Sequence, residues 1–352
     1  MNSFGRIYRL TTFGESHGRA VGGIIDGMPP RQVIDLRELQ AQADRRRPGT
    51  SPLASARREA DRVQILSGVM GYDLQSGEIG PLTADSPHGI TLGTPIGFMA
   101  ENGDARSEDY EAMRHVYRPS HADFTTEARY EIRDWRGGGR ASGRETFARV
   151  VGGAFARQLL AKKGITVTSR IASVGGMDNP SDDEIARIIS EARGDADSVG
   201  GIVECVVSGM PAGVGEPVFG KLDQMLGAAM LSVGAVKGVE FGMGFGGVGR
   251  RGSEVADNFV NCGGVVTTAS NFSGGIQGGI SNGAPIVMRV AVKPTPTIAR
   301  ELATVDDCGR PATVTGRGRH DPCILPRVMP VIEAMAAMTL LDAMLLRLTS
   351  DF

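Results

Sequence analysis

The sequence is unusually rich in glycine. Glycine makes up 50 of the 352 residues, about twice its usual share of ~7%. The runs have no fixed period, which excludes collagen and solenoid repeats. The main runs are Gly22-Gly23, Gly137-Gly138-Gly139, Gly246-Gly247, Gly263-Gly264, Gly274-Gly275 and Gly278-Gly279. Because glycine lets backbone amides approach a ligand closely, these loops predict a broad site lined largely by backbone.

The charge balance argues against a nucleic-acid-binding protein. Such a protein needs a basic surplus to neutralise phosphates and aromatic side chains on which bases stack. This chain has a formal net charge of -2 and only 5% aromatic residues. The arginines at positions 45–47, taken alone, are typical of a solvated surface. We therefore expect no nucleic-acid partner.

The cysteines and histidines give no sign of a disulfide framework or a metal site. The four cysteines lie far apart, with no C-x-x-C pair, and no two of the five histidines are closely paired. The first residues lack the order of a signal peptide, and no stretch approaches ~18 uninterrupted apolar residues. We expect a cytoplasmic protein with no metal ligands and no membrane partner.

Helical and strand patterns alternate irregularly along the chain, which indicates an α+β fold. One helix is expected after a capping box formed by Ser142 and Glu145, ending at residues 162–164. A second is expected over residues 181–193, and a long closing helix over 327–348 is apolar nearly all round, which predicts burial. Strands are expected at residues 165–174, 202–208, 236–241 and 285–293. With no break in composition, we expect a single domain over 1–352, with a surface insertion at 72–93.

Two histidines lie in segments too polar to be core strands. His17 sits in a Gly-rich stretch, where it could cap a turn or act as an acid or base of near-neutral pKa. His121 lies in a similar turn, with Asp123 as a possible orienting carboxylate.

A glycine run next to two arginines indicates an anion site. Residues 137–139 precede Arg140 and Arg144 at the predicted start of a helix, where free amides and guanidinium groups converge. A surface loop with solvated arginines is the alternative. The segment from Lys293 to Thr297 offers a cation and two hydroxyls on a rigid backbone, which suits a phosphate.

An Asp-Pro step at Asp321 lies among basic residues, which exposes its carboxylate or simply forms a turn. Residues 242–247 satisfy G-x-G-x-x-G, but Arg250 and Arg251 follow where a dinucleotide-binding fold needs an apolar helix, so we interpret the match as false. The residues alone indicate an enzyme for phosphorylated, carboxylated small molecules. A nicotinamide-dependent reductase, based on those glycines, remains the alternative.

The same segments, in order along essentially the whole chain, resemble the signatures of the chorismate synthase family. They are Gly14-Glu15-Ser16-His17-Gly18, Arg45-Arg46-Arg47-Pro48-Gly49, Arg118-Pro119-Ser120-His121-Ala122-Asp123, the stretch from Gly137 to Thr146, the stretch from Gly274 to Ser281, and Gly318-Arg319-His320-Asp321-Pro322-Cys323. The resemblance implies a single-domain β-α-β sandwich of the chorismate synthase type, assembled as a homotetramer. It implies a lyase of aromatic amino-acid biosynthesis (the shikimate pathway). The reaction is trans-1,4-elimination of phosphate from 5-enolpyruvylshikimate 3-phosphate to give chorismate, and it needs reduced FMN (FMNH2) although there is no net redox change.

The resemblance also implies roles for individual residues. His17 corresponds to the proton donor to the departing phosphate, and His121 to the residue that protonates reduced flavin near N1. Asp321 corresponds to the group that, with flavin N5, removes the C6 proton, while Ser16 and Ser142 correspond to supporting hydroxyls. The implied FMN contacts are Arg140, Ala141, Ser142, Ala235, Gly278, Lys293, Pro294, Thr295, Pro296, Thr297 and Arg319. The implied substrate-binding residues are Arg46, Arg47 and Arg144, of which Arg46 matches a position for substrate or reduced nicotinamide (NADP).

Two positions depart from the family pattern. Pro52 stands where relatives often have a basic residue, which weakens any nicotinamide site, so we expect a separate flavin reductase. Gly234 stands where relatives commonly have a polar residue, which removes a side-chain contact to flavin.

Overall fold

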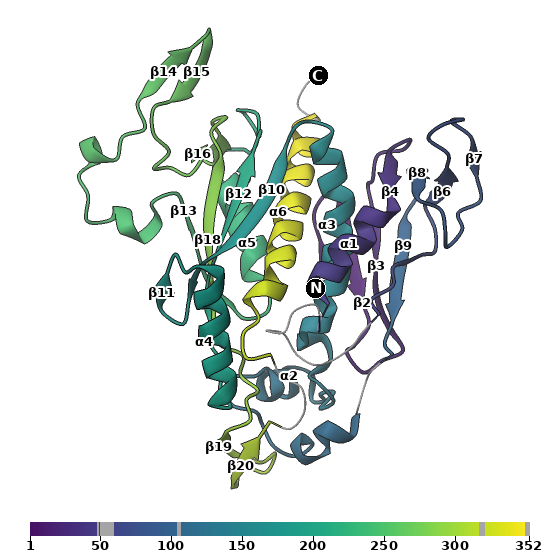
Figure 1. Cartoon of the computed structure of the whole chain (residues 1–352), viewed down its shortest axis with the longest axis vertical. Helices are drawn as coiled ribbons and strands as arrows, with labels where there is room; N and C mark the ends of the chain where they lie inside the picture. The colour runs from purple at the N-terminus through teal and green to yellow at the C-terminus, as the bar shows by residue number, and fades with distance from the viewer. Residues whose placement is uncertain (48, 50–59, 104–106, 317–320, 349–352) are drawn as a thin grey trace.

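Two antiparallel sheets of five strands enclose a layer of helices (Figure 1). The computed structural model describes residues 1–47, 49, 60–103, 107–316 and 321–348. The first sheet has the order β1 (Ser3–Phe4), β2 (Arg9–Phe13), β3 (Ala20–Asp26), β9 (Ile96–Glu101), β5 (Gln64–Ile65). The second has the order β11 (Met177–Asp178), β10 (Thr166–Val174), β12 (Gly201–Ser208), β18 (Ile286–Val292), β13 (Val236–Phe241). This arrangement confirms the expected β-α-β sandwich.

The helices between the sheets form the core of the sandwich. They are α1 (Leu36–Arg46), α3 (Thr146–Ala161), α5 (Leu222–Leu231) and α6 (Leu325–Leu348). The axes of α3 and α6 approach closely at Gly153, where a Cβ atom would lie 2.2 Å from the Cβ of Ala334. Outside this layer, α4 (Asp182–Gly194) packs near β11, and α2 (Asp123–Tyr130) lies at one end of the sandwich with the 3-10 helix η1 (Ser107–Met113).

Smaller elements decorate the two sheets. A four-stranded sheet has the order β4 (Val33–Asp35), β8 (His88–Thr91), β6 (Val69–Tyr72), β7 (Ile79–Gly80). The hairpins are β14 (Phe259–Cys262) with β15 (Val265–Thr268), β16 (Ile276–Gln277) with β17 (Ile280–Ser281), and β19 (Glu301–Val305) with β20 (Pro311–Thr315). Short 3-10 turns are η2 (Gly139–Ala141), η3 (Gly143–Glu145), η4 (Gly244–Gly247) and η5 (Gly252–Glu254).

Most of the predicted elements are present. The four expected strands are β10, β12, β18 and β13, and they lie side by side in one sheet. Helix α4 starts at a capping box in which Ser181 and Glu184 bond each other's backbone. The predicted capping box at Ser142 is wrong: Ser142 Oγ accepts from the Arg144 N–H at the start of η3, and the Glu145 carboxylate instead accepts from Arg149. Helix α3 therefore begins at Thr146, one turn later.

The closing helix α6 is buried, as its composition predicts. Its length and composition would allow it to cross a membrane, but most of its apolar stretch is buried between the two sheets, as in a core helix. The segment expected as a surface insertion, residues 72–93, differs in burial along its length. Residues 73–87 are exposed or half-buried, whereas the residues of β8 that follow are largely buried.

The G-x-G-x-x-G match at residues 242–247 is false, as predicted. Four of these residues form the 3-10 turn η4, and no α-helix follows it before the β14–β15 hairpin. The positive dipole end that would hold a pyrophosphate is therefore missing from this part of the described chain.

Candidate active site

A cavity of about 620 Å³ opens at one end of the helix layer, where loops from both halves of the chain meet. Its wall is built from the start of α6, the turns η2 and η3, the segment around His121, and the ends of β13 and β18. The lining includes Arg46, Tyr110, Arg118, Ser120, His121, Arg140, Ser142, Arg144, Ala235, Lys293, Thr295, Thr297, Asp321 and Arg327. The volume is typical of a small-molecule site.

The wall of the cavity is strongly cationic. It carries eight basic side chains: Arg46, Arg118, Arg140, Arg144, Arg149, Lys237, Lys293 and Arg327. Among the described residues, two carboxylates lie in the same wall, those of Glu145 and Asp321. A concave site with this excess of positive charge attracts small polyanions.

Few of the glycines that predicted a backbone-lined site lie at the cavity. Among the described residues, three glycines belong to its wall: Gly137, Gly143 and Gly234. Other glycine doublets serve turns: Gly263 and Gly264, for example, join β14 to β15 with positive φ angles.

The glycine run at residues 137–139 brings the two predicted histidines to one place. A Cβ on Gly137 would lie 2.6 Å from Cε1 of His17, and one on Gly138 would lie 2.7 Å from Cε1 of His121. Both glycines also have positive φ angles. The backbone of this run therefore separates and supports the two imidazoles, which no larger residue would allow.

His121 is oriented by a buried carboxylate. Its Nδ1 lies 3.0 Å from Oδ1 of Asp123. The Asp123 carboxylate also accepts two hydrogen bonds of 2.7 Å from the Arg118 guanidinium, one at each oxygen. Burial opposes ionisation of Asp123, but the hydrogen bonds from Arg118 and His121 lower the pKa of its carboxyl well below the usual range. Because an ionised carboxylate only accepts, the Nδ1 of His121 carries a proton, and Nε2 is left for the cavity.

His17 lies beside the cavity rather than in its wall. Its Nδ1 is 3.0 Å from the hydroxyl of buried Ser16, and its ring meets the ring of Tyr110 edge to face at 5.1 Å. Tyr110 and Gly137 do line the cavity. His17 thus lies directly behind two residues of the cavity wall, and Ser16 contacts its Nδ1.

Asp321 belongs to a chain of alternating charges. Its carboxylate pairs with Arg327, whose Nε donates to the backbone carbonyl of Arg46 at 3.1 Å. The side chain of Arg46 pairs in turn with Asp61, and Asp61 also pairs with Arg144. Three guanidinium groups and two carboxylates therefore share one corner of the site.

The expected flavin-binding residues fall mostly on the cavity wall. Arg140, Ala141, Ser142, Ala235, Lys293, Thr295, Pro296 and Thr297 are all in it. Lys293 Nζ donates to the carbonyl of Ser120 at 2.6 Å, while Thr295 Oγ1 is buried with no hydrogen-bond partner among the described residues. Arg319 and Pro52 lie outside the described residues.

Three expected binding residues do not reach the cavity wall. Gly278 lies in the β16–β17 hairpin, and the residue after it, Gly279, lies against Lys221 at the start of α5. The cavity adjoins the other end of that helix. Arg47 follows α1 and lies 3.6 Å from the carboxylate of Asp44. Pro294 lies between two lining residues without being one itself.

Arg144 lines the cavity, and protein acceptors hold its side chain in place. Its Nε donates to Asn102, its Nη1 pairs with Asp61, and its Nη2 donates to the carbonyl of Glu101. These contacts use three of the five guanidinium N–H groups, so Arg144 supports the wall and stays an expected substrate-binding residue.

Sequence reasoning missed several residues of the site. Asp61, Arg327, Arg149 and Lys237 carried no motif, although three of them line the cavity and Asp61 pairs with two lining residues. A basic residue in the first turn of a buried apolar helix, as at Arg327, was the signal available, since such a charge needs a partner.

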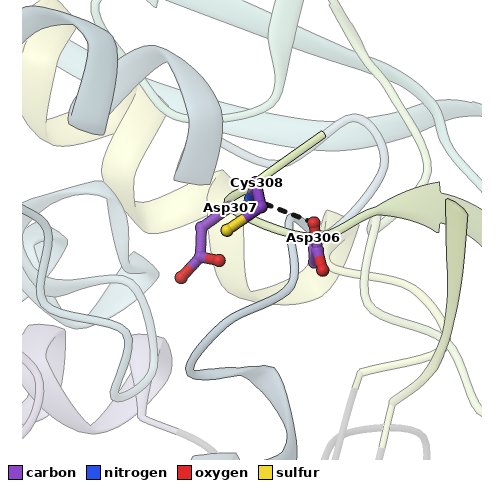
Figure 2. Close-up of side chains that lie close together, drawn as sticks. All are labelled: Asp306, Asp307 and Cys308. Atoms are coloured by element: carbon purple, nitrogen blue, oxygen red, sulfur yellow. Dashed lines mark hydrogen bonds between the residues drawn. The ribbon is translucent and has the colours of Figure 1, made fainter. Parts of the chain in front are cut away.

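One group of potential metal ligands occurs among the described residues, outside the cavity wall. Figure 2 shows Asp306, Asp307 and Cys308 in the turn between β19 and β20. Asp306 Oδ1 accepts from the Cys308 N–H at 2.9 Å, and Asp307 pairs with His115 at 2.7 Å. These contacts satisfy the carboxylates as an ordinary turn does.

An antiparallel sandwich with a cationic cavity, two supported histidines and a carboxylate defines an enzyme acting on a small anionic molecule. The sequence model of the chorismate synthase family matches residues 8–345. The chorismate synthase of Azobacteroides pseudotrichonymphae is 46% identical over 365 positions, covering 97% of this chain and 98% of the relative. That of Synechocystis sp. is 45% identical over 368 positions, covering 98% and 97%. The chain belongs to the chorismate synthase family.

A solved structure supports the same assignment. A crystal structure of chorismate synthase superposes with a TM-score of 0.73 at 28% identity, covering 99% of this chain and 95% of that one. The fold class, the lyase activity and the conversion of 5-enolpyruvylshikimate 3-phosphate to chorismate that the sequence indicated are thus confirmed. The alternative of a nicotinamide-dependent reductase finds no support.

Proposed function

We propose that this cavity is where the chain carries out the chorismate synthase reaction, and that His17, His121 and Asp321 act in it. The reaction breaks a C–H bond at C6 and a C–O bond to phosphate at C3, and forms a new double bond. It therefore needs an acceptor for the C6 proton and stabilisation of the departing phosphate. The single observation that carries the proposal is the cavity wall, which contains Asp321 and His121 together with eight basic side chains of the described residues.

The proposed roles follow from the contacts of each side chain. Asp321, whose side chain is largely buried in the cavity wall, accepts the C6 proton while Arg327 fixes its orientation. His17 donates a proton or a charged hydrogen bond to the phosphate, with Ser16 holding the ring. His121 presents Nε2 to the cavity because Asp123 holds Nδ1. Ser142 supplies a hydroxyl in the wall.

The family implies a flavin requirement, and we propose reduced FMN as the flavin. The residues present fit such a group: Thr295 Oγ1 is buried without a hydrogen-bond partner among the described residues, and Lys293 and Lys237 lie near each other in the wall. Arg140, Ala141, Ser142, Ala235, Lys293, Thr295, Pro296 and Thr297 would hold it. When bound, a reduced flavin supplies electron density to a reaction without net redox change.

A separate enzyme is proposed as the source of reduced flavin. The false dinucleotide motif at residues 242–247 supports this, because it forms a 3-10 turn. Sustained turnover in air on NADPH and FMN alone would contradict it. A cytoplasmic location is proposed as well, supported by four cysteines that are free thiols.

A homotetramer of single-domain chains is also proposed. One hydrophobic cluster runs through both sheets and the helix layer, which supports a single domain over residues 1–352. The segment 242–273, here called the arm, projects from the body at the β14–β15 hairpin (Figure 1). It exposes large apolar side chains, and an isolated two-stranded hairpin is barely stable in water, so another copy is expected to cover it. These side chains are Phe245, Val248, Phe259, Val265 and Val266.

The proposed base is tested by Asp321→Asn. The variant keeps the shape and one acceptor oxygen but cannot take up a proton, so phosphate release should fall by about 10²–10⁴-fold. The flavin spectral change on adding substrate should remain, because binding depends on the cationic wall. Phosphate is measured under anaerobic conditions with reduced FMN, and Asp306→Asn, in an exposed turn, serves as the matched control. Wild-type phosphate release by a folded variant that binds both ligands would show that Asp321 is not the base.

A further inference from the structure

Asp61 lies at the centre of the charged corner but does not line the cavity. Its side chain is fully buried, with Oδ2 bound by Arg46 and Oδ1 bound by Arg144. Both arginine side chains are themselves at least 97% buried, at 1% and 3% exposure. Among the described residues, Asp61 is the one carboxylate that pairs with either of them within 4 Å.

The backbone around Asp61 is held to the helix that carries Arg46. Gln40, on α1, donates through Nε2 to the carbonyl of Asp61 at 3.1 Å and accepts from the N–H of Val63 at 2.9 Å. Asp61 has a φ of 45°, a left-handed conformation that few residues other than glycine adopt. A bridge from α1 thus fixes a strained residue where its carboxylate meets two arginines.

The charges of this corner do not balance without a ligand. Arg46, Arg144 and Arg327 carry three positive charges, and Asp61 and Asp321 carry two negative ones. Burial lowers the pKa of Arg46 to about 10, an effect that Asp61 opposes. The Nε of Arg46 is buried with no hydrogen-bond partner among the described residues. One positive charge and one donor are therefore left for an anion from the cavity.

We propose that Asp61 is a positioning residue for the chorismate synthase reaction, which keeps Arg46 oriented toward an anionic group of the substrate. The inference rests on the activity established for the family. Asp61 acts through Arg46 and does not touch the substrate. Arg144 serves the same purpose from the other side, since its three nitrogens all bind protein acceptors. The chemistry recognised is a carboxylate or phosphate oxygen at the Arg46 edge of the cavity.

The test is Asp61→Asn, with Glu333→Gln as the matched control. Glu333 is a second buried carboxylate held by two arginines, Arg45 and Arg157, but it lies away from the cavity wall. Both variants should lose stability, because Asp61→Asn leaves two buried arginines without a counter-charge and Glu333→Gln removes the charge of a buried carboxylate that two partly exposed arginines hold. Only Asp61→Asn should raise KM for 5-enolpyruvylshikimate 3-phosphate, by about tenfold or more, with a smaller change in kcat.

Two further measurements separate positioning from general damage. In the double variant Arg46→Gln with Asp61→Asn, KM should match that of Arg46→Gln alone, because Asp61 acts through Arg46. The Kd of inorganic phosphate, measured by calorimetry without turnover, should rise in Asp61→Asn and not in Glu333→Gln. Because phosphate binding is measured without turnover, its result does not depend on the assigned activity.

An unchanged KM and phosphate Kd in folded Asp61→Asn would overturn the proposal. So would an equal change in Glu333→Gln, or additive effects in the double variant. If Asp61→Asn does not fold, Asp61→Glu replaces it: the charge is kept but the two arginines are displaced by about one methylene. That variant should raise KM and phosphate Kd several-fold at near wild-type folding, and unchanged values would contradict the proposal equally.

Discussion

At the scale of single residues, the site depends on side chains that act in pairs. Asp123 with His121, Ser16 with His17, and Arg327 with Asp321 each join a reactive group to a partner that fixes it. Such partners raise precision because a catalytic group must be held within a fraction of an ångström of its working geometry. Mutation of a partner residue should therefore impair function, as mutation of the group that it holds does.

The Asp123–His121 pair can be tested through the position of the imidazole proton. In Asp123→Asn the amide can donate to Nδ1, which would move the proton of a neutral ring to Nε2 and remove the negative charge that orients His121. We expect kcat to fall on the order of 10²-fold, and the 15N chemical shifts of His121 to report the exchanged tautomer.

The control for this variant is Glu127→Gln. Glu127 also pairs with an arginine of the same cluster, Arg133, at 2.8 Å, but it does not contact His121. It should leave both kcat and the His121 shifts near wild type. Folded Asp123→Asn with wild-type kcat would refute an orienting role for Asp123.

At the scale of elements, the arm stands out because its large apolar side chains are exposed in the single chain. Its base is well built: despite the cost of burial, hydrogen bonds from Ser270, Ser273 and the Phe272 N–H lower the pKa of Asp257 to about 2. Its hairpin, in contrast, exposes every residue of β14. An ordered base with an uncovered apolar tip is typical of a segment that packs against another subunit.

Replacing the apolar tip should therefore weaken assembly. The wild type should have a mass in solution about four times 37.0 kDa. The double variant Val265→Ser with Val266→Ser should shift this mass downward at low micromolar concentration, because both side chains are 66% exposed in the single chain. Light scattering after size exclusion measures the mass.

Leu74→Ser provides the comparison, since Leu74 is 58% exposed but lies in the surface insertion. Its mass should equal that of the wild type. A monomeric wild type, or an arm variant that stays fully assembled, would contradict the proposed homotetramer.

At the scale of the whole molecule, the sequence predicted one half of the sandwich better than the other. The strands of the second sheet alternate or run apolar without glycine clusters, so β10, β12, β13 and β18 were found. The first sheet was not, because β3 contains Gly22 and Gly23, which resemble a loop. In the fold, a Cβ on Gly22 would lie 2.3 Å from the carbonyl oxygen of Phe98, so glycine is needed where β3 pairs with β9. Local pattern cannot report such close approach between distant strands.

The site shows the same division between local and long-range information. His17, His121 and Asp321 stand out because loops that carry reactive groups have an unusual composition. Asp61 and Arg327 do not, because their meaning arises only when α1, α6 and the segment before β5 are brought together. Gly278 and Arg47 carried the right motifs and yet lie away from the cavity wall of one chain.

The most direct test of the account is anaerobic incubation of the protein with reduced FMN and 5-enolpyruvylshikimate 3-phosphate. Phosphate is assayed together with the absorbance of chorismate and the redox state of the flavin. Phosphate and chorismate should form in equal amounts over many turnovers, and the flavin should still be reduced at the end. No phosphate release, or oxidation of one flavin for each substrate consumed, would contradict it.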